Sequence, residues 1–179
     1  LPFIKGEAKI GANVEVGYYD QTQSALTPSN TVLEELWSAF PTTPEVEIRN
    51  RLGAFLFSGD DVKKSVSMLS GGEKARLLLA KLSMENNNFL ILDEPTNHLD
   101  IDSKEVLENA LIDFDGTLLF VSHDRYFINR VATKVLEISE TGSTLYLGDY
   151  DYYLEKKAEL EAEAQPDQIE TANQSAGAM

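Results

Sequence analysis

Two uninterrupted apolar runs constrain the fold of this chain more than any other feature. They are Phe89–Leu92, which follows the polar turn 86–88, and Leu118–Val121. Apolar runs of this length between turn signals are typical of strands buried on both faces of a parallel sheet. Between them lies an apolar stripe with helical spacing, made of Val106, Leu107, Ala110, Leu111 and Phe114. The segment predicts a right-handed strand–helix–strand unit, and hence an α/β fold with a mainly parallel sheet.

Polar residues follow each of these two runs at the point where the strand ends. Asp93–Pro95 follows the first run and Ser122–Asp124 follows the second. Open α/β sheets bind ligands just beyond the carboxyl ends of their strands. Both polar groups are therefore candidates for a functional site.

The first part of the chain combines a predicted hairpin with a predicted helical region. Glu7–Ile10 and Val14–Tyr18 alternate apolar and polar residues around a short turn, which predicts two antiparallel strands at the N-terminus. A polar loop over 20–30 then leads into a helix over Thr31–Phe40, because its apolar residues have helical spacing. A second helix is expected to have Thr43 as its N-cap and Pro44 as its first residue, and to run through Phe55.

The segment Leu69-Ser70-Gly71-Gly72-Glu73 carries a helix start signal. Ser70 and Glu73 have the spacing of a capping box, and the apolar stretch Ala75–Leu82 supplies the helix behind it. The two glycines leave the backbone N–H groups uncovered, and such a helix N-terminus is suited to binding an anion. Taken alone, Ser-x-x-Glu favours an ordinary capped helix, because capping boxes are frequent.

The last part of the chain predicts a hairpin and two further helices. Arg125–Ala132 is expected to be helical, and Lys134–Ile138 pairs with Thr144–Leu147 in an antiparallel hairpin. Asp151–Glu163 predicts an acidic helix. The tail from Gln165 is rich in polar and small residues, which predicts disorder.

The net charge of −15 over 179 residues argues against a broad basic face for nucleic acid. The excess lies in two blocks: residues 89–115 carry eight acidic groups and one basic group, and residues 149–179 carry eight and two. The absence of cysteine excludes disulfide scaffolds and cysteine-ligated zinc. No apolar run approaches the roughly 20 residues of a membrane span, so we expect a soluble, cytoplasmic protein without a membrane segment.

The order of these motifs resembles the nucleotide-binding domain of ATP-binding-cassette (ABC) proteins, over essentially residues 5–150. The resemblance identifies Gln21, in Gly17–Gln21, as the Q-loop glutamine and Leu69–Glu73 as the signature sequence. It also identifies the Walker B strand Phe89–Asp93 with its following Glu94, the D-loop Asn97–Asp100 and the switch His123. The implied fold is a P-loop NTPase-like domain with a helical subdomain at about 31–84, followed by an acidic helix and tail at 151–179.

The resemblance implies ATP and Mg²⁺ as cofactors and a role for each motif residue. Asp93 and Gln21 would serve the metal, since Mg²⁺ takes one or two carboxylates and keeps several waters. Glu94, His123 and Gln21 would act in catalysis by orienting water and donating to the transferred phosphoryl group. The nucleotide contacts would come from Ser70, Gly71, Gly72, Glu73 and Asp100.

Three stretches also resemble the ABC-F branch of this family: Leu92–Asp100, Ser122–Phe127 and Gly148–Tyr150. This resemblance implies a Mg²⁺-dependent ATPase that acts on the ribosome and its rRNA in translation, and in some members protects against antibiotics. The chain would correspond to the C-terminal cassette, which forms a head-to-tail sandwich with a second ABC domain.

The phosphate loop G-x-x-x-x-G-K-[ST] does not occur in the printed sequence. Since the family places this Walker A loop before the Q-loop, we expect the chain to begin partway through its domain and to bind ATP poorly by itself. Two alternatives stay open: the motor subunit of a membrane transporter, and a non-catalytic interaction module.

Overall fold

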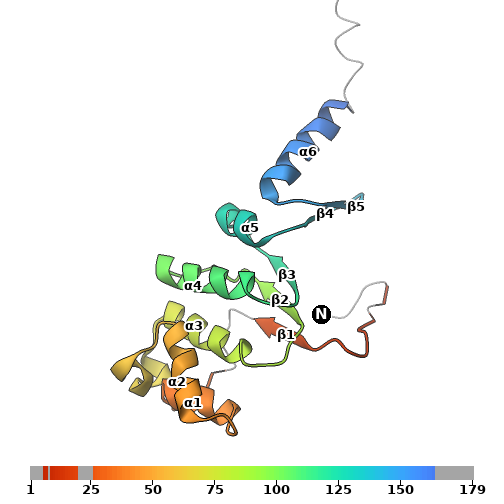
Figure 1. Ribbon diagram of the computed structural model, residues 1–179. Coiled ribbons are helices and arrows are strands. Elements are labelled where there is room, and N and C mark those ends of the chain that lie inside the picture. Colours follow the sequence, from red (N-terminus) through yellow and green to blue (C-terminus); the bar gives the residue numbers. More distant parts are fainter. Residues whose placement is uncertain (1–5, 8, 20–25, 164–179) are drawn as a thin grey trace, which may run out of the picture. The chain divides into compact units, whose positions relative to one another are not determined.

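The structure is a computed structural model that describes residues 6–7, 9–19 and 26–163 (Figure 1). It divides the chain into two compact units, residues 1–123 and 124–179. The domain boundary expected at residue 150 stays a prediction. The first unit contains β1 (Val16–Tyr19), α1 (Val32–Ala39), α2 (Glu45–Ala54), the 3₁₀ helices η1 (Gly59–Lys63) and η2 (Val66–Met68), α3 (Gly71–Leu82), β2 (Phe89–Asp93), α4 (Ile101–Ile112) and β3 (Thr117–Val121).

The sheet of the first unit confirms the predicted strand–helix–strand segment. Its order is β1-β2-β3, and both pairs are parallel. Helices α3 and α4 lie on one side of this sheet in Figure 1. Leu90 and Leu92 are buried toward one face, whereas Tyr18 and Leu119 are 55% and 50% exposed on other strands. The expectation that β2 is buried on both faces is therefore wrong for the described residues, because Phe89 and Ile91 are only half-buried.

The N-terminal hairpin predicted around residues 11–13 is also wrong within the described residues. Only its second strand forms, and this strand, β1, pairs in parallel with β2. The side chain of Asn88 explains the pairing: its amide donates to the Asn13 carbonyl at 2.8 Å, and its Oδ1 accepts from the Glu15 N–H at 2.9 Å. Asn88 thereby holds residues 13–15, which precede β1, beside the start of β2.

The region between β1 and β2 is helical, as predicted. Thr31 caps α1 in a capping box with Glu34, which satisfies backbone N–H groups at the helix start. The core of this region includes Val32, Leu36, Ile48 and Leu52, each fully buried. One detail differs: Pro44 rather than Thr43 is the N-cap of α2, and no side chain caps that helix.

A buried carboxylate ties this helical region together. Glu35 of α1 has a side chain only 3% exposed. It accepts hydrogen bonds from the Thr27 N–H at 3.2 Å and the Asn30 amide at 2.8 Å, and it pairs with Lys81 of α3 at 3.1 Å. A buried charge is tolerated only when it is paired and hydrogen-bonded. Glu35 therefore fastens the segment 27–30 and two helices to one another.

The second unit contains α5 (Arg125–Val131), β4 (Val135–Ser139), β5 (Gly142–Tyr146) and α6 (Tyr150–Glu163). The antiparallel pairing of β4 with β5 confirms the predicted C-terminal hairpin. Glu137 on β4 accepts from the hydroxyls of Tyr146 and Tyr153 at 3.3 and 3.0 Å and pairs with Lys157. This cluster joins α6 to the hairpin. The predicted disordered tail lies outside the described residues.

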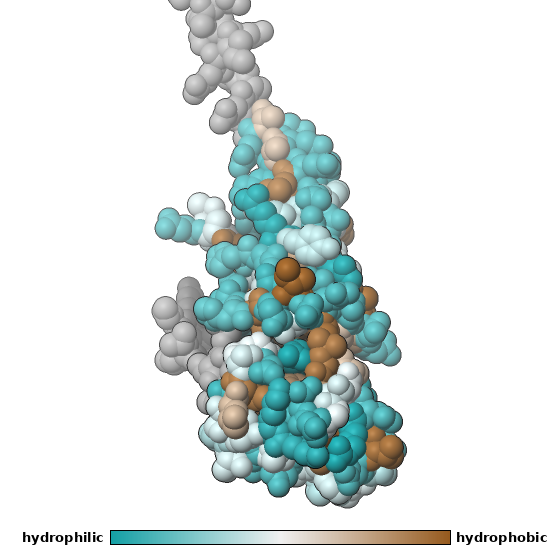
Figure 2. Space-filling model, turned by 90° about the vertical axis from the view of Figure 1, so that its left-hand side faces the viewer, coloured by the Kyte–Doolittle hydropathy of each residue, from teal (hydrophilic) through white to brown (hydrophobic). Residues whose placement is uncertain are grey.

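The described surface is mostly polar. Figure 2 shows hydrophilic residues over most of the face in view, with hydrophobic residues singly or in small groups. The most exposed large hydrophobic residues include Ile101 at 83% and Met68 at 79%. Of the helices in the described part of the chain, none is both long enough and apolar enough to cross a bilayer.

Candidate functional site

The carboxyl ends of the three parallel strands meet at one edge of the sheet. Tyr19 of β1 lies opposite Leu92 of β2, and Asp93 lies opposite Val121 of β3. The residues that follow β2 and β3 are consequently brought to the same edge. Burial raises the pKa of Tyr19 to about 12, so its hydroxyl stays protonated at this edge. Gln21, which follows β1 by two residues, lies outside the described residues.

The predicted site residues Glu94 and His123 lie in contact at this edge. The Glu94 carboxylate is 3.2 Å from Nε2 of His123, and it accepts the His123 backbone N–H at 3.3 Å. Glu94 also donates its own N–H to the Val121 carbonyl at 2.9 Å. Its φ of +46° lies in the left-handed region, which costs free energy for any residue other than glycine. Strain of this kind is typical of functional sites.

Asp93 occupies the last position of β2 and is exposed to solvent. Its carboxylate is a hard oxygen ligand of the type that Mg²⁺ prefers, and Mg²⁺ needs only one or two such ligands from a protein. In the described part of the chain, histidine, cysteine and carboxylate side chains do not gather in groups of three or more that could hold a metal.

The N-terminus of α3 has the predicted capping box. Ser70 Oγ accepts from the Glu73 N–H at 3.2 Å, and the Ser70 N–H donates to the Glu73 carboxylate at 2.8 Å. The latter hydrogen bond holds the pKa of Glu73 below its usual range. A Cβ at Gly71 would meet nothing within 4 Å. There is thus space beside Gly71, and the dipole of α3 favours an anion at this end of the helix.

Gly72 lies against the start of α4, a contact that the sequence did not reveal. A Cβ at Gly72 would sit 3.3 Å from Ser103 Oγ and 3.5 Å from the Asp100 carboxylate. Asp100 is the N-cap of α4 and accepts from the Ser103 N–H at 2.8 Å. The Ser103 side chain nearby and the Ser103 N–H, which donates to this carboxylate, hold the pKa of Asp100 below its usual range. The absence of a side chain at Gly72 therefore lets two helix N-termini approach each other.

The predicted site residues thus form two groups in the described structure. The strand-edge group is Asp93, Glu94 and His123, at the ends of β2 and β3. The helix-end group is Ser70–Glu73 and Asp100, at the N-terminal ends of α3 and α4. A short turn connects them, in which His98 has a φ of +61°.

Sequence reasoning missed Arg76, which orients the start of α3. Its guanidinium donates to the carbonyls of Phe55 and Leu56 at 3.1 and 3.2 Å and lies 5.0 Å from the Phe57 ring centroid. These contacts join the end of α2 to α3, one turn after Glu73. An arginine within the apolar stretch behind Ser70 was the signal available in the sequence.

Comparison with known proteins places the chain in a family. The family model described as "ABC transporter" matches residues 5–97. The ATP-binding protein YdiF of Bacillus subtilis (strain 168) is 68% identical over 93% of this chain and 26% of its own length. "ABC transporter F family member 5" of Arabidopsis thaliana is 44% identical over 90% of this chain and 24% of its own length. The chain belongs to the ABC-F family.

This ABC-F chain spans about a quarter to a third of the length of its curated relatives. One further relative is the "Energy-dependent translational throttle protein EttA" of Haemophilus influenzae, 40% identical over 92% of this chain and 31% of its own length. The family model covers Ser70–Glu73, Asp93 and Glu94, whereas Asp100 and His123 lie beyond it.

Solved structures show the fold of this ABC-F chain. The "RNase-L Inhibitor" superimposes with a TM-score of 0.63 at 22% identity, over 86% of this chain and 32% of its own. A dimeric post-hydrolysis state of the ATP-binding cassette MJ0796 with ADP and Pi superimposes with a TM-score of 0.56 at 23% identity, over 69% and 58%. The fold is that of an ABC nucleotide-binding domain, with a parallel sheet and a small antiparallel pair.

Proposed function

We propose that this ABC-F chain supplies catalytic and nucleotide-binding residues to a Mg²⁺-dependent ATPase. The observation that carries the proposal is the Glu94–His123 contact at the carboxyl edge of the sheet. Phosphoryl transfer requires a positioned water and neutralised charge, with little covalent chemistry by the protein. A carboxylate at a strand end can position the water, and an imidazole beside it can donate to a phosphate oxygen.

In the proposed mechanism each strand-edge residue has one task. Glu94 accepts a proton from the attacking water or orients it, and the His123 ring donates to the γ-phosphate. Asp93 and Gln21 would hold Mg²⁺, which would supply positive charge to the phosphate oxygens. The fixed carboxylate of Glu94, bonded to the His123 N–H, explains how the two side chains stay in register.

The helix-end group is proposed to bind the γ-phosphate of ATP that a second ABC domain holds. The N-terminus of α3 supports this, because the helix dipole favours a negative charge there and there is space beside Gly71. Ser70, Gly71, Gly72 and Glu73 form this end, and Asp100 lies beside it. The two domains would then form a head-to-tail sandwich.

We propose that the ATPase acts in the cytoplasm on the ribosome and its rRNA. The support is similarity to EttA, whose name describes a translational throttle. A transporter motor is the second candidate, which the description of the family model favours. Sedimentation of the natural protein from a lysate separates them: recovery with ribosomes supports the first candidate, and recovery with membranes the second.

The test of the ATPase proposal is Glu94→Gln in the natural protein that carries this sequence. The amide keeps the size of the side chain but cannot take a proton, so hydrolysis should fall by about 100-fold or more while ATP stays bound. Phosphate release and retained radiolabelled ATP are the measurements. Glu105→Gln, an exposed change on α4, is the matched control. Unchanged turnover in Glu94→Gln would falsify the role of Glu94.

A further inference from the structure

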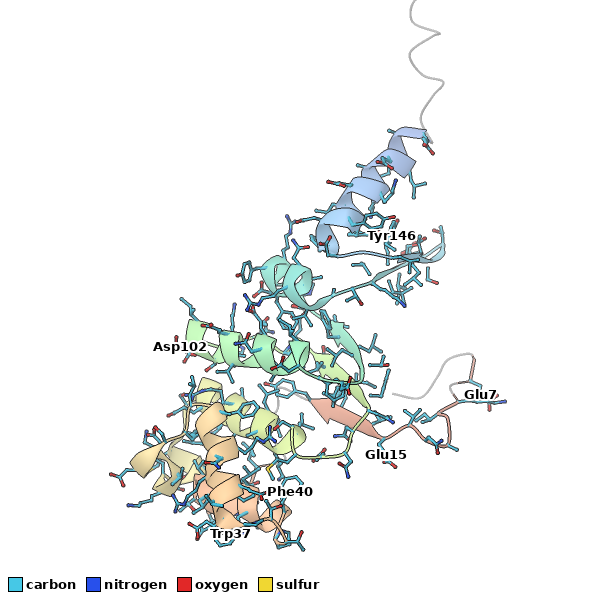
Figure 3. All side chains as sticks on the ribbon, in the orientation of Figure 1. Glu7, Glu15, Trp37, Phe40, Asp102 and Tyr146 are labelled. Atoms are coloured by element: carbon cyan, nitrogen blue, oxygen red, sulfur yellow. The ribbon has the colours of Figure 1, made fainter. Side chains whose placement is uncertain are left out.

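Two buried side-chain atoms of the described residues have no hydrogen-bond partner, and both belong to residues near the helix-end group. They are Ser103 Oγ and Arg76 Nε. Ser103 is the third residue of α4, in the turn where Figure 3 labels Asp102, and it is fully buried. The Ser103 side chain and N–H, and more weakly the charge of Arg76, hold the pKa of Asp100 below its usual range. Both residues therefore lie near the Asp100 carboxylate.

The stability of the folded chain does not account for a serine at position 103. A buried hydroxyl without a partner costs free energy, because it has lost its hydrogen bonds to water and gained none within the protein. Folded proteins keep few such groups, and each one calls for an explanation. Alanine would occupy the same position without this cost and is the better helix former. The hydroxyl of Ser103 therefore has another use.

The Asp100 carboxylate is the charged acceptor beside this hydroxyl. The point that a Cβ at Gly72 would occupy lies 3.3 Å from Ser103 Oγ and 3.5 Å from Asp100 Oδ2. Asp100 Oδ1 already accepts the Ser103 N–H at 2.8 Å. Because Asp100 is exposed and Ser103 is buried, the carboxylate can turn while the hydroxyl stays in place. A small rotation would let this carboxylate accept both the N–H and the hydroxyl of Ser103.

We propose that Ser103 is a positioning residue, whose hydroxyl donates to the Asp100 carboxylate when a second ABC domain docks on the helix-end group. This inference rests on the proposed function, which brings ATP and a second domain to that group. In the undocked chain the Ser103 N–H alone holds the carboxylate. On docking, the added hydrogen bond fixes Asp100 beside the start of α3 and satisfies the hydroxyl of Ser103.

Docking itself gives the carboxylate a reason to turn. A second domain excludes water from the helix-end group, and a desolvated carboxylate gains more from each hydrogen bond than an exposed one does. A misplacement of about 1 Å in a residue of this kind slows a reaction that depends on positioning. Loss of the Ser103 hydroxyl should therefore slow ATP turnover more than it weakens ATP binding.

The first test is Ser103→Ala in the natural protein that carries this sequence. The kcat for ATP hydrolysis should fall about tenfold, as expected for one lost hydrogen bond to a charged acceptor, and KM for ATP should change by less than about twofold. Ser38→Ala, the same change at an exposed position of α1, is the matched control and should leave both constants unchanged. An unchanged kcat in Ser103→Ala would overturn the inference even where Glu94→Gln abolishes turnover, so the inference and the proposed function fail by different results.

A double-mutant cycle with Asp100→Ala shows whether Ser103 acts through Asp100. In the Asp100→Ala background, Ser103→Ala should lower kcat by less than about twofold, because the acceptor is already gone. A tenfold loss in both backgrounds would contradict the proposed route through Asp100.

Thermal unfolding of the full chain separates positioning from a structural role. Ser103→Ala should unfold at the same temperature as the unaltered chain or a higher one, because the substitution removes a buried hydroxyl that has no partner. A decrease of several degrees would show that the hydroxyl stabilises the undocked fold, and would overturn the proposal.

Discussion

Two glutamates of the first unit, Glu35 and Glu94, illustrate how burial separates a structural carboxylate from a reactive one. Glu35 is 3% exposed and bonded to groups that are themselves held in place, including Lys81 at 22% exposed. Glu94 is 17% exposed, and its partner His123 has a ring that is 94% exposed. A carboxylate with fixed, buried partners holds the chain together. A carboxylate whose partner can move into solvent is available for chemistry.

The largest loss of stability is expected when Glu35 is replaced. Glu35→Ala should lower the free energy of unfolding by about 3–5 kcal/mol, because it leaves Lys81 and the Asn30 amide without their buried partner. Urea unfolding followed by the fluorescence of Trp37, the single tryptophan, measures this directly. Trp37, which is labelled in Figure 3, lies on α1, the helix that also contains Glu35.

The matched control for that experiment is Glu47→Ala, an exposed glutamate on α2. It should change the free energy of unfolding by less than about 0.5 kcal/mol, as exposed positions usually do. A Glu35→Ala variant as stable as this control would show that the buried network does not hold the helices together.

Ser70 and Glu73 were predictable because a capping box is formed by residues three apart. The segment from β2 to β3 was predictable because its apolar periodicity is local. The apolar stripe of α4 did not define where this helix begins, and Asp100, interpreted as a nucleotide contact, is also its N-cap.

The errors arose where partners distant in sequence decide the structure. Asn88 bonds to Asn13 and Glu15, more than 70 residues away, and no local pattern reveals that β1 pairs with β2. The burial of Glu35 likewise depends on Lys81, which lies 46 residues further along. The proximity of Glu94 to His123 was expected only in outline, because parallel strands end at a common edge.

A smaller effect distinguishes the two glycines of the helix-end group. Gly71→Ala should be neutral or stabilising by up to about 1 kcal/mol, because helix propensity rises and its Cβ meets open space. Gly72→Ala should be less stable than Gly71→Ala by about 1 kcal/mol, because its Cβ presses on Ser103 and Asp100. Thermal unfolding of the two variants compares them. Equal stability would mean that α4 does not need the close approach at Gly72.

The smallest effect is expected at Glu137 of the second unit, a half-buried counterpart to Glu35. Its hydrogen bond with Lys157 holds the pKa of Glu137 below the ordinary value of 4.5. A carboxylate with a lower pKa in the folded state than in the unfolded state stabilises the fold at pH values above the unfolded pKa. This stabilisation is lost as the pH falls through the folded pKa. The packing of Tyr146 on Tyr153, with centroids 4.9 Å apart, should therefore weaken below about pH 4.5.

Near-ultraviolet circular dichroism of the tyrosines follows that transition. Lys157→Met should move its midpoint toward higher pH, because the largest cause of the depressed pKa is removed. An unchanged midpoint in this variant would contradict the role of Lys157.

The central claim is that Glu94 and His123 act as one catalytic unit. A double-mutant cycle on ATP turnover in the natural protein, with Glu94→Gln, His123→Ala and the pair, tests it most directly. Residues that act as a unit are strongly non-additive, so the double variant should be no more than about twofold slower than Glu94→Gln alone. Independent, multiplicative losses from the two substitutions would contradict the claim.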